Sequence, residues 1–460
     1  MITFWDVVER CSDGERMKES AYDALLWKHV SEIIKTYNIK FNPDQIIPGD
    51  DSLADRAFEA GLELFRQVGF YCLDTQRVVR FSRNEIEDRL RIAPDKYVWG
   101  EGKDQGITIA RKVEDPRDPS FVASGLGVPV PQDMFVKVCQ ALASVPLADA
   151  FCGVSLYNTF RGIPIRAGNP IEVAAAIWDV SKRREAARLA GRPGLGLYAM
   201  ISCAESTTAI IAAAREQFGA LKNDVTQNGA IAELKVDFAR MNKVPWQMES
   251  GAGIAGLYGP LMGGYAGGPE GTMLTQIAHF FLGLFAFNAD YHIPFPIDIN
   301  QVCNTSSPML WLVSVYSQAI ARNTHLLNES VAMAAAGPAT KMLFYELAAH
   351  AITATVSGGN LVSAGIARDK YPERVSTLEI QTGSEVGHIA ARMGMTRKDA
   401  NEVVKKLIAR YEKDILKAPL GKKFGEIYDL EKVKPRPEYQ IIYDEVQGEL
   451  KDLGLNYALL

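Results

Sequence analysis

The residues that could do chemistry in this chain lie where short apolar runs end. In AGRPGLGLYAM, residues 190–200, three spaced glycines and a proline lead into an apolar run around Tyr198. A phenol can act as a general acid, and its aromatic face attracts cations. Other candidate residues lie at or just after the ends of similar apolar runs, and they are Gln227, Glu249, Leu257, Tyr258, Tyr265 and His292.

Glycines accompany these candidates at two places. Gly194 and Gly196 lie before or within the run that contains Tyr198, and Gly263 and Gly264 open GGYAGG, ahead of a helix that starts near Pro269. Glycine accepts positive φ and lets a large ligand approach the backbone closely. Tight corners of the chain explain the same spacing, and spacing alone favours that second interpretation.

Several familiar chemistries have no motif here. The chain contains no HExxH, no GxSxG and no Walker loop, so metal-dependent hydrolysis, serine hydrolysis and phosphoryl transfer are not indicated. Asp290 and His292 read as a buried pair rather than a metal site, and we expect no bound metal. Glu205 and Glu249 could form an acid and base pair, but Glu205 stands where a helix begins and is better explained as a partner of the helix dipole.

The elements that must position these residues alternate between short strands and long helices. Apolar or glycine-rich runs near residues 121–125, 148–156, 195–202, 230–237, 251–257, 291–299 and 331–336 can each be read as a strand before a corner and a helix. About eight such units predict an α/β protein with a parallel (β/α)8 TIM barrel. The alternative is an open doubly wound sheet, for which GAGIAG is a formal GxGxxG match, but Pro260 and further glycines follow where a helix should start.

Three regions are expected along the chain. Residues 1–115 form a helical and small-sheet extension packed on the barrel, residues 116–395 form the barrel, and residues 396–460 form C-terminal helices. Ser82 and Glu85 predict a capping box at the start of one helix in the first region. The segment 273–289 is too short and too polar for a membrane span and predicts a buried helix.

Composition limits the partners. Hydrophobic residues make up 47% of the 460, and the formal net charge is −5, which provides no general surface for nucleic acid or for an anionic membrane. The six cysteines are scattered and the N-terminus does not read as a signal peptide, so a cytoplasmic protein that acts on small molecules or proteins is expected.

Long ordered motifs give a more specific indication. Besides AGRPGLGLYAM and LMGGYAGG, they are GFYCLDTQRVVRFSRNEI, TFRGIPIRAGNPIEVAAA, AAGPATKM, TATVSGGNLVSAG and YEKDILKAPLGKKFGEIYDLEKV. With these the chain resembles the monomethylamine:corrinoid methyltransferase family over nearly its whole length. The resemblance implies a homo-oligomer, a hexamer, that passes a methyl group from a small amine to the cobalt of a separate, cognate corrinoid protein. No corrinoid is then tightly bound by the chain itself.

The resemblance also marks the pocket. In the family, pyrrolysine follows G-x-G-x, and this chain has Tyr198 there. By the same likeness Leu257 and Gln227 stand at acidic positions of the family and Val331 at a glutamine position, while Tyr258 adds an aromatic face. Gly194, Gly196, Gly263 and Gly264 are assigned to the close approach of the cofactor.

These replacements lead to a prediction about the donor. A phenol cannot form the amine adduct of an imine, so we expect a pyrrolysine-independent methyltransferase whose donor is a quaternary ammonium or another N-methyl compound rather than monomethylamine. Two alternatives stay open. Tyr198 could protonate the leaving group of an O-methyl or S-methyl donor, or the barrel could be inactive and only bind a corrinoid protein.

Overall fold

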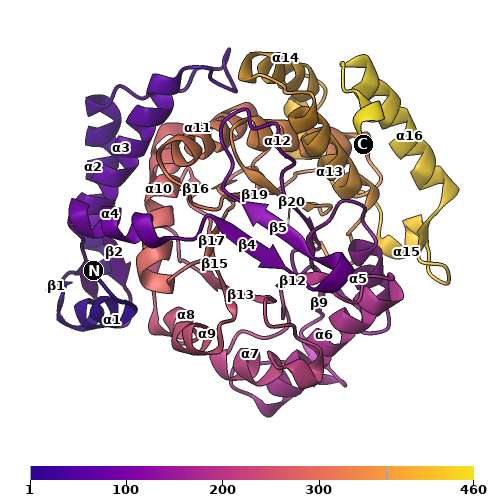
Figure 1. The fold of residues 1–460 in the computed structure, drawn as a ribbon, viewed down its shortest axis with the longest axis horizontal. Helices are drawn as coiled ribbons and strands as arrows, with labels where there is room; N and C mark the ends of the chain where they lie inside the picture. The colour runs from indigo at the N-terminus through magenta and orange to yellow at the C-terminus, as the bar shows by residue number, and fades with distance from the viewer. Residues whose placement is uncertain (1, 369–370) are drawn as a thin grey trace.

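Eight parallel strands form a closed barrel at the centre of the molecule (Figure 1). The computed structural model describes residues 2–368 and 371–460. In chain order the barrel strands are β6 (Phe121–Ser124), β8 (Ala150–Cys152), β12 (Gly196–Ala199), β13 (Val225–Gly229), β15 (Gly253–Tyr258), β17 (Tyr291–Pro294), β19 (Glu329–Ala332) and β20 (Asn360–Ala364).

Two runs of paired strands make up this barrel, with the orders β12-β8-β6-β20-β19 and β13-β15-β17. The Met200 N–H donates to the Val225 carbonyl at 3.0 Å and joins β12 to β13, and a bridge between His292 and Asn328 joins β17 to β19. The (β/α)8 barrel predicted from the alternation of elements is therefore confirmed. GAGIAG lies at the start of β15 and does not open a helix, which agrees with setting the doubly wound alternative aside.

Helices follow each barrel strand and form the outer layer (Figure 1). They are α5 (Phe135–Ala143), α6 (Pro170–Leu189), α7 (Thr207–Ala213), α8 (Phe238–Met241) with α9 (Val244–Ser250), α10 (Pro269–Leu282), α11 (Ser307–Asn323), α12 (Lys341–Val356) and α13 (Leu378–Arg392). The α6 helix starts where the Asn169 side chain accepts from the Ile171 N–H and Pro170 fits the first turn. Because α3 and α11 pack against α10, that helix is buried as predicted.

The first region is a helical layer with a small sheet, drawn in indigo in Figure 1. It contains α1 (Phe4–Asp13), β1 (Glu15–Arg16), α2 (Glu19–Thr36), α3 (Asp51–Val68), β2 (Phe70–Cys72), β3 (Arg77–Val79) and α4 (Arg83–Ile92). Both hydrogen bonds of the predicted capping box between Ser82 and Glu85 are present.

The prediction of one barrel strand was wrong. Residues 230–237 leave the barrel, and their short strand β14 (Lys235–Val236) pairs with β2 at the edge of the small sheet. The fourth barrel strand is instead β13, whose sequence VTQNG is polar because Asn228 bonds Gln247 of α9 and Gln227 faces the barrel mouth.

A hairpin closes the amino-terminal end of the barrel. Strands β4 (Lys96–Trp99) and β5 (Gly106–Ile109) flank a short 3₁₀ turn, Gly102–Asp104, and lie across the barrel in Figure 1. Trp99 is fully buried inside the barrel, with its ring 5.2 Å from Tyr291 and 5.6 Å from Tyr198. The hairpin is therefore the floor of the barrel interior.

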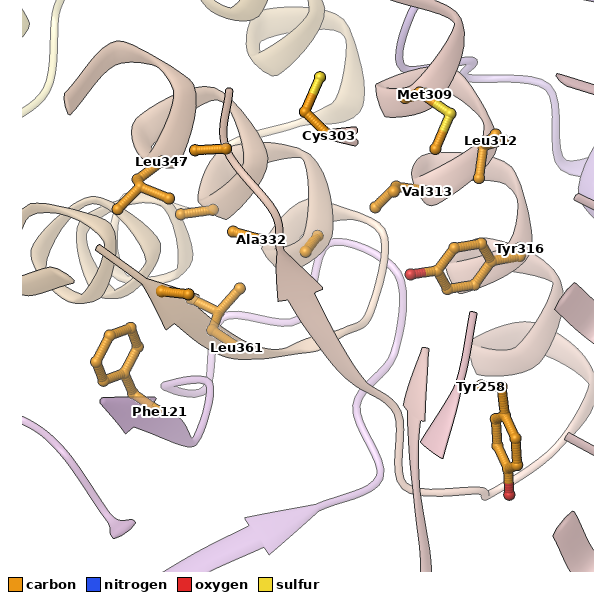
Figure 2. Packing of buried hydrophobic residues seen from close by; sticks show 14 of the residues in the cluster. Phe121, Tyr258, Cys303, Met309, Leu312, Val313, Tyr316, Ala332, Leu347 and Leu361 are labelled. Carbon is orange, nitrogen blue, oxygen red and sulfur yellow. The ribbon is translucent and has the colours of Figure 1, made fainter. Parts of the chain in front are cut away.

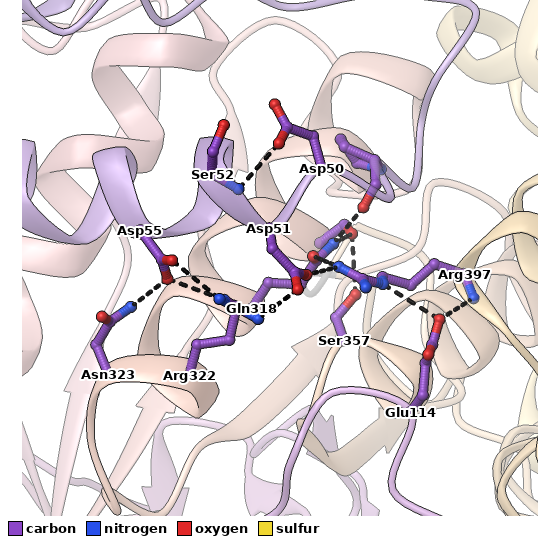
Figure 3. Close-up of polar contacts among 12 residues, drawn as sticks. Asp50, Asp51, Ser52, Asp55, Glu114, Gln318, Arg322, Asn323, Ser357 and Arg397 are labelled. Atoms are coloured by element: carbon purple, nitrogen blue, oxygen red, sulfur yellow. Dashed lines mark hydrogen bonds and ion pairs between the residues drawn. The ribbon is translucent and has the colours of Figure 1, made fainter.

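The C-terminal region consists of α14 (Arg397–Ile408), α15 (Phe424–Ile427), β21 (Tyr428–Asp429), β22 (Lys434–Pro435) and α16 (Pro437–Asp452). Arg397 ties it to the rest of the molecule, since one guanidinium nitrogen lies 2.7 Å from both Asp51 of α3 and Gln318 of α11 (Figure 3). Glu114 accepts from the backbone N–H of the same arginine at 2.7 Å.

Short strands line the mouth side of the barrel. They are β7 (Pro129–Val130), β9 (Ser155–Leu156), β10 (Thr159–Phe160), β11 (Ile163–Pro164), β16 (Leu261–Met262) and β18 (Ile297–Asp298). Apolar packing forms two clusters, a large one between strands and helices and a smaller one inside the barrel. Figure 2 shows part of the large cluster, including Phe121, Leu361, Tyr316 and Tyr258. Within the described ranges, every helix is too short or too polar to cross a membrane.

Candidate active site

A cavity of about 870 Å³ opens at the carboxyl ends of β12, β13 and β15. Ala199, Gln227 and Leu257 line it from the strand ends, and Glu205, Arg240 and Lys243 are its charged lining residues. In barrels of this type the reactive groups lie at this end of the strands. The cavity is therefore the candidate active site.

An arginine of α6 holds the end of β12 in place. The fully buried Arg183 donates to the Ala199 carbonyl at 2.8 Å and to the Val154 carbonyl at 2.9 Å, and it forms an ion pair with Asp179 one turn earlier. Asp179 also accepts from the Ser202 N–H at 3.0 Å. This buried group fixes the start of the loop that forms one wall of the cavity.

A second carboxylate of α6 fixes the rest of that loop. Glu172 accepts from the backbone N–H groups of Glu205 and Ser206 at 2.7 and 2.8 Å, and from the Ser206 hydroxyl at 2.5 Å. Glu205 therefore lies at the rim of the cavity with its backbone N–H held by Glu172. Glu249 is not a lining residue of the cavity, so the geometry does not support an acid and base pair of these two residues.

Tyr198 occupies a β-bulge. Leu197 pairs with Phe151 and Ala199 with Cys152, so Tyr198 is the extra residue between them. Bulges commonly redirect a side chain next to an active site. Here the ring is buried inside the barrel, 6.0 Å from the ring of Tyr291, and it is not among the residues that line the cavity. Tyr198 thus lies toward the barrel floor.

The floor carries a buried carboxyl group that the sequence did not reveal. Glu329 accepts from the Thr108 hydroxyl at 2.7 Å through one oxygen, and its carboxyl group also interacts with the buried Tyr198 hydroxyl, whereas the Tyr291 hydroxyl has no hydrogen-bond partner among the described residues. Burial raises the pKa of Glu329 to about 8. Burial, with the nearby Glu329 carboxyl, also raises the pKa of Tyr198 well above its usual value.

Three residues occupy positions at which the resembled family has polar side chains, and all three lie inside the barrel. Gln227 and Leu257 lie on adjacent strands and both line the cavity. Val331 is buried in the interior cluster, outside the cavity lining. The structure therefore brings two of these three residues together at the cavity.

Tyr258 lies elsewhere, which corrects its assignment to the substrate pocket. Its side chain points out of the barrel toward α10, where its hydroxyl lies 3.0 Å from Nδ1 of His292 and its ring 5.7 Å from that of His279. Burial among these groups raises its pKa well above the usual value. Tyr258 belongs to the packing between strands and helices (Figure 2).

The glycines separate into two groups. Gly194 and Gly196 lie at the amino-terminal end of β12, where a Cβ on Gly194 would come within 2.3 Å of the Glu101 carbonyl in the floor hairpin. Close chain packing therefore requires them, and they lie at the opposite end from the cavity, which corrects their assignment to cofactor approach. Gly263, with φ +93°, and Gly264 lie in the turn after β16 on the mouth side, but not in the cavity lining.

Lys243 is a cavity residue that sequence reasoning missed. It is the N-cap residue of α9, a position that favours Ser, Thr, Asp or Asn, and its lysine adds positive charge at the positive end of the helix dipole. Burial, with a smaller effect of the neighbouring Arg240, lowers the pKa of Lys243 to about 8. Its position in the cavity and its burial come from the tertiary fold, and the local sequence carries no signal for either.

In the part of the chain that the structure describes, no group of three or more His, Cys, Asp or Glu side chains could hold a metal ion.

The fold is that of a (β/α)8-barrel enzyme, and the cavity at the barrel mouth is its candidate site. Residues 2–455 match the family model for monomethylamine methyltransferase MtmB. The chain therefore belongs to the monomethylamine methyltransferase family and is a methyltransferase.

Known relatives cover almost the entire chain. It is 29% identical over 454 residues to monomethylamine methyltransferase MtmB3 of Methanosarcina barkeri and 28% identical to MtmB1 of Methanosarcina acetivorans, with 98% of each chain covered. It is also similar to the crystal structure of Methanosarcina barkeri MtmB, with a TM-score of 0.94, 28% identity and 98% coverage of both chains. A structure of a hydroxylamine complex of MtmB matches equally well.

Proposed function

We propose that this methyltransferase transfers a methyl group from a small methylated compound other than monomethylamine to cobalt(I) of a separate corrinoid protein. The observation that carries the proposal is the cavity at the ends of β12, β13 and β15, which a small donor can enter from the barrel mouth. We further propose that the protein acts as a homo-oligomer, a hexamer by its resemblance to the family, and binds its corrinoid protein over the mouth.

The lining of the cavity supports a donor other than monomethylamine. Tyr198 stands at the position that the resemblance assigns to pyrrolysine, and it has no electrophilic carbon to which an amine could add. Gln227 and Leu257 occupy the assigned acidic positions and give the cavity no carboxylate there. A primary ammonium ion would therefore lose its solvation without a compensating charge at these two positions.

The charge of the cavity favours an O-methyl or S-methyl donor over the quaternary ammonium predicted from the sequence. Arg240 and Lys243 line it against one carboxylate, Glu205, and its described lining includes no aromatic side chain. A permanent cation would be repelled here and would find no ring face to bind. A neutral methyl ether or thioether avoids that cost, but its leaving group then needs a proton.

A donor panel tests the proposal. The protein is mixed with a Co(I) corrinoid protein from the same source and with monomethylamine, tetramethylammonium, 2-methoxyphenol or dimethyl sulfide, and the absorbance spectrum reports methyl-cobalt(III). We expect transfer from 2-methoxyphenol or dimethyl sulfide and none from monomethylamine. Transfer from tetramethylammonium alone would favour the quaternary class, and transfer from monomethylamine would overturn the proposal. Binding of the corrinoid protein without any transfer would favour an inactive barrel.

Tyr258→Phe tests whether this residue lies outside the site. The change leaves Nδ1 of His292 without its buried partner, so we expect the free energy of unfolding to fall by about 1–3 kcal/mol. The rate of methyl transfer should stay within about twofold of the parent, because the lost hydroxyl faces α10 rather than the cavity. A large loss of rate without a loss of stability would return Tyr258 to the substrate pocket.

A further inference from the structure

We infer that Lys243 is the proton donor to the leaving group of the methyl donor. The inference rests on the proposed function and specifies the class of donor, namely one whose oxygen or sulfur leaves as an anion and must be protonated. It assigns to Lys243 the general-acid role that the sequence had suggested for Tyr198.

The placement of Lys243 supports this role. It lines the same cavity as Gln227 and Leu257, and its Nζ has no hydrogen bond or ion pair within the described parts of the chain. Lys235, eight residues earlier, shows the contrast, because its Nζ lies 2.7 Å from both Glu19 and Asp23. A lysine that lines a cavity and has no protein partner can offer its amino group to a ligand.

The other polar groups near the cavity are poorer proton donors. Tyr198 is turned toward the barrel floor, and the Ser206 hydroxyl is already bonded to Glu172. Arg240 is held in an ion pair with Asp237, and a guanidinium group is a poor general acid. Glu205 is the remaining charged lining residue, and it is exposed at the rim of the cavity.

The acidity of Lys243 suits the task. With the pKa of Lys243 lowered to about 8, this lysine is protonated in roughly nine-tenths of the molecules at pH 7. A general acid works best when its pKa lies near the working pH, since it then both holds and releases the proton readily. An ordinary lysine, with a pKa near 10.5, would hold its proton more tightly.

The reaction balances without a further reagent. As the methyl–oxygen or methyl–sulfur bond breaks, the methyl group is taken up by the electron pair of cobalt(I) of the corrinoid protein. The oxygen or sulfur keeps the bonding pair and accepts a proton from Nζ of Lys243. The neutral amine then regains a proton from water at the open rim of the cavity.

Three variants test the role of Lys243. They are Lys243→Met, Lys243→Arg and, as a matched control, Lys222→Met, which removes an exposed lysine outside the cavity. With 2-methoxyphenol we expect Lys243→Met to lower the rate of methyl transfer by about 10²- to 10⁴-fold, with no rescue by arginine, which keeps the charge but does not release its proton. Any transfer from tetramethylammonium should not fall, because that donor already carries its positive charge.

The pH dependence gives a second readout. Only the protonated lysine can act, so the parent rate with 2-methoxyphenol should fall about tenfold per pH unit above about pH 8. Arg240 and Glu205 are the other charged side chains that line the cavity. Rescue by arginine, or a rate that is level from pH 7 to pH 10, would overturn the inference.

A measurement without turnover separates this inference from the proposed function. Lysines labelled by reductive methylation with ¹³C-formaldehyde are followed by NMR, and the signal absent from Lys243→Met identifies the residue. We expect it to titrate near pH 8, and titration near 10.5 would overturn the inference even if transfer is observed. If no donor in the panel is demethylated, the proposed function fails, and the role of Lys243 fails with it.

Discussion

Arg183→Met is expected to lower the free energy of unfolding by about 3–5 kcal/mol and to reduce methyl transfer at least tenfold. Breaking a buried ion pair by removing one partner leaves an uncompensated charge, here on Asp179. The carbonyls of Ala199 and Val154 also lose their donors, and each unpaired buried acceptor adds to the cost. Since Ala199 directly follows the Tyr198 bulge, the wall of the cavity should loosen as well.

Chemical denaturation and the donor assay measure the two effects. Lys182→Met is the matched control, because its pair with Glu185 lies on the exposed side of the same helix, and such pairs contribute about 0–1 kcal/mol. Equal stability of the two variants would show that Arg183 does not hold the loop. A stable Arg183→Met protein with full activity would contradict the proposed organisation of the cavity wall.

Glu329→Gln is expected to remove a large pH dependence of stability. The pKa of this carboxyl is about 8 in the folded protein and near 4.5 when it is exposed, so the unfolded chain loses the proton first as pH rises. Folding stability must then fall between about pH 4.5 and pH 8, by at most about 1.4 kcal/mol per pH unit, and stay low above that range. Over the whole interval the loss is roughly 3–6 kcal/mol.

Unfolding at pH 5 and pH 8.5 distinguishes the variant from the parent protein. The amide does not titrate, so Glu329→Gln should lose several kcal/mol less stability between these two pH values than the parent. Glu87→Gln, at an exposed ion pair of α4, should follow the parent. An identical pH dependence in Glu329→Gln and the parent would mean that the barrel floor holds an ionised carboxylate.

The fold could be predicted because its signal is repeated along the chain. Apolar runs recur before polar corners and long helices, and parallel pairing follows from that alternation. The prediction of the fourth strand was wrong because the barrel strand is polar here and the neighbouring segment outside the barrel is more apolar. In β13 the polar Gln227 and Asn228 are needed at the cavity and against α9, whereas the more apolar residues 230–237 serve the small sheet.

The site was harder to predict because side-chain direction depends on local geometry. Successive residues of a strand point to opposite faces, so Leu257 and Tyr258 could not both face the cavity, and this rule would have excluded one of them. The direction of Tyr198 depends on a bulge, which has no sequence signal here. Lys243 and Glu329 have unusual pKa values because of their burial. The segments that bury them are distant in the sequence, so the sequence alone could not identify these residues.

The floor hairpin constrains the order of events during turnover. Strands β4 and β5 close the amino-terminal end of the barrel, so the donor enters and its demethylated product leaves through the mouth. A corrinoid protein that reaches the same cavity must cover that opening. Under the proposed function, the small molecule therefore binds first and the large partner second, and the product is released only after the partner has dissociated. Inhibition by excess corrinoid protein is the kinetic signature of such a compulsory order.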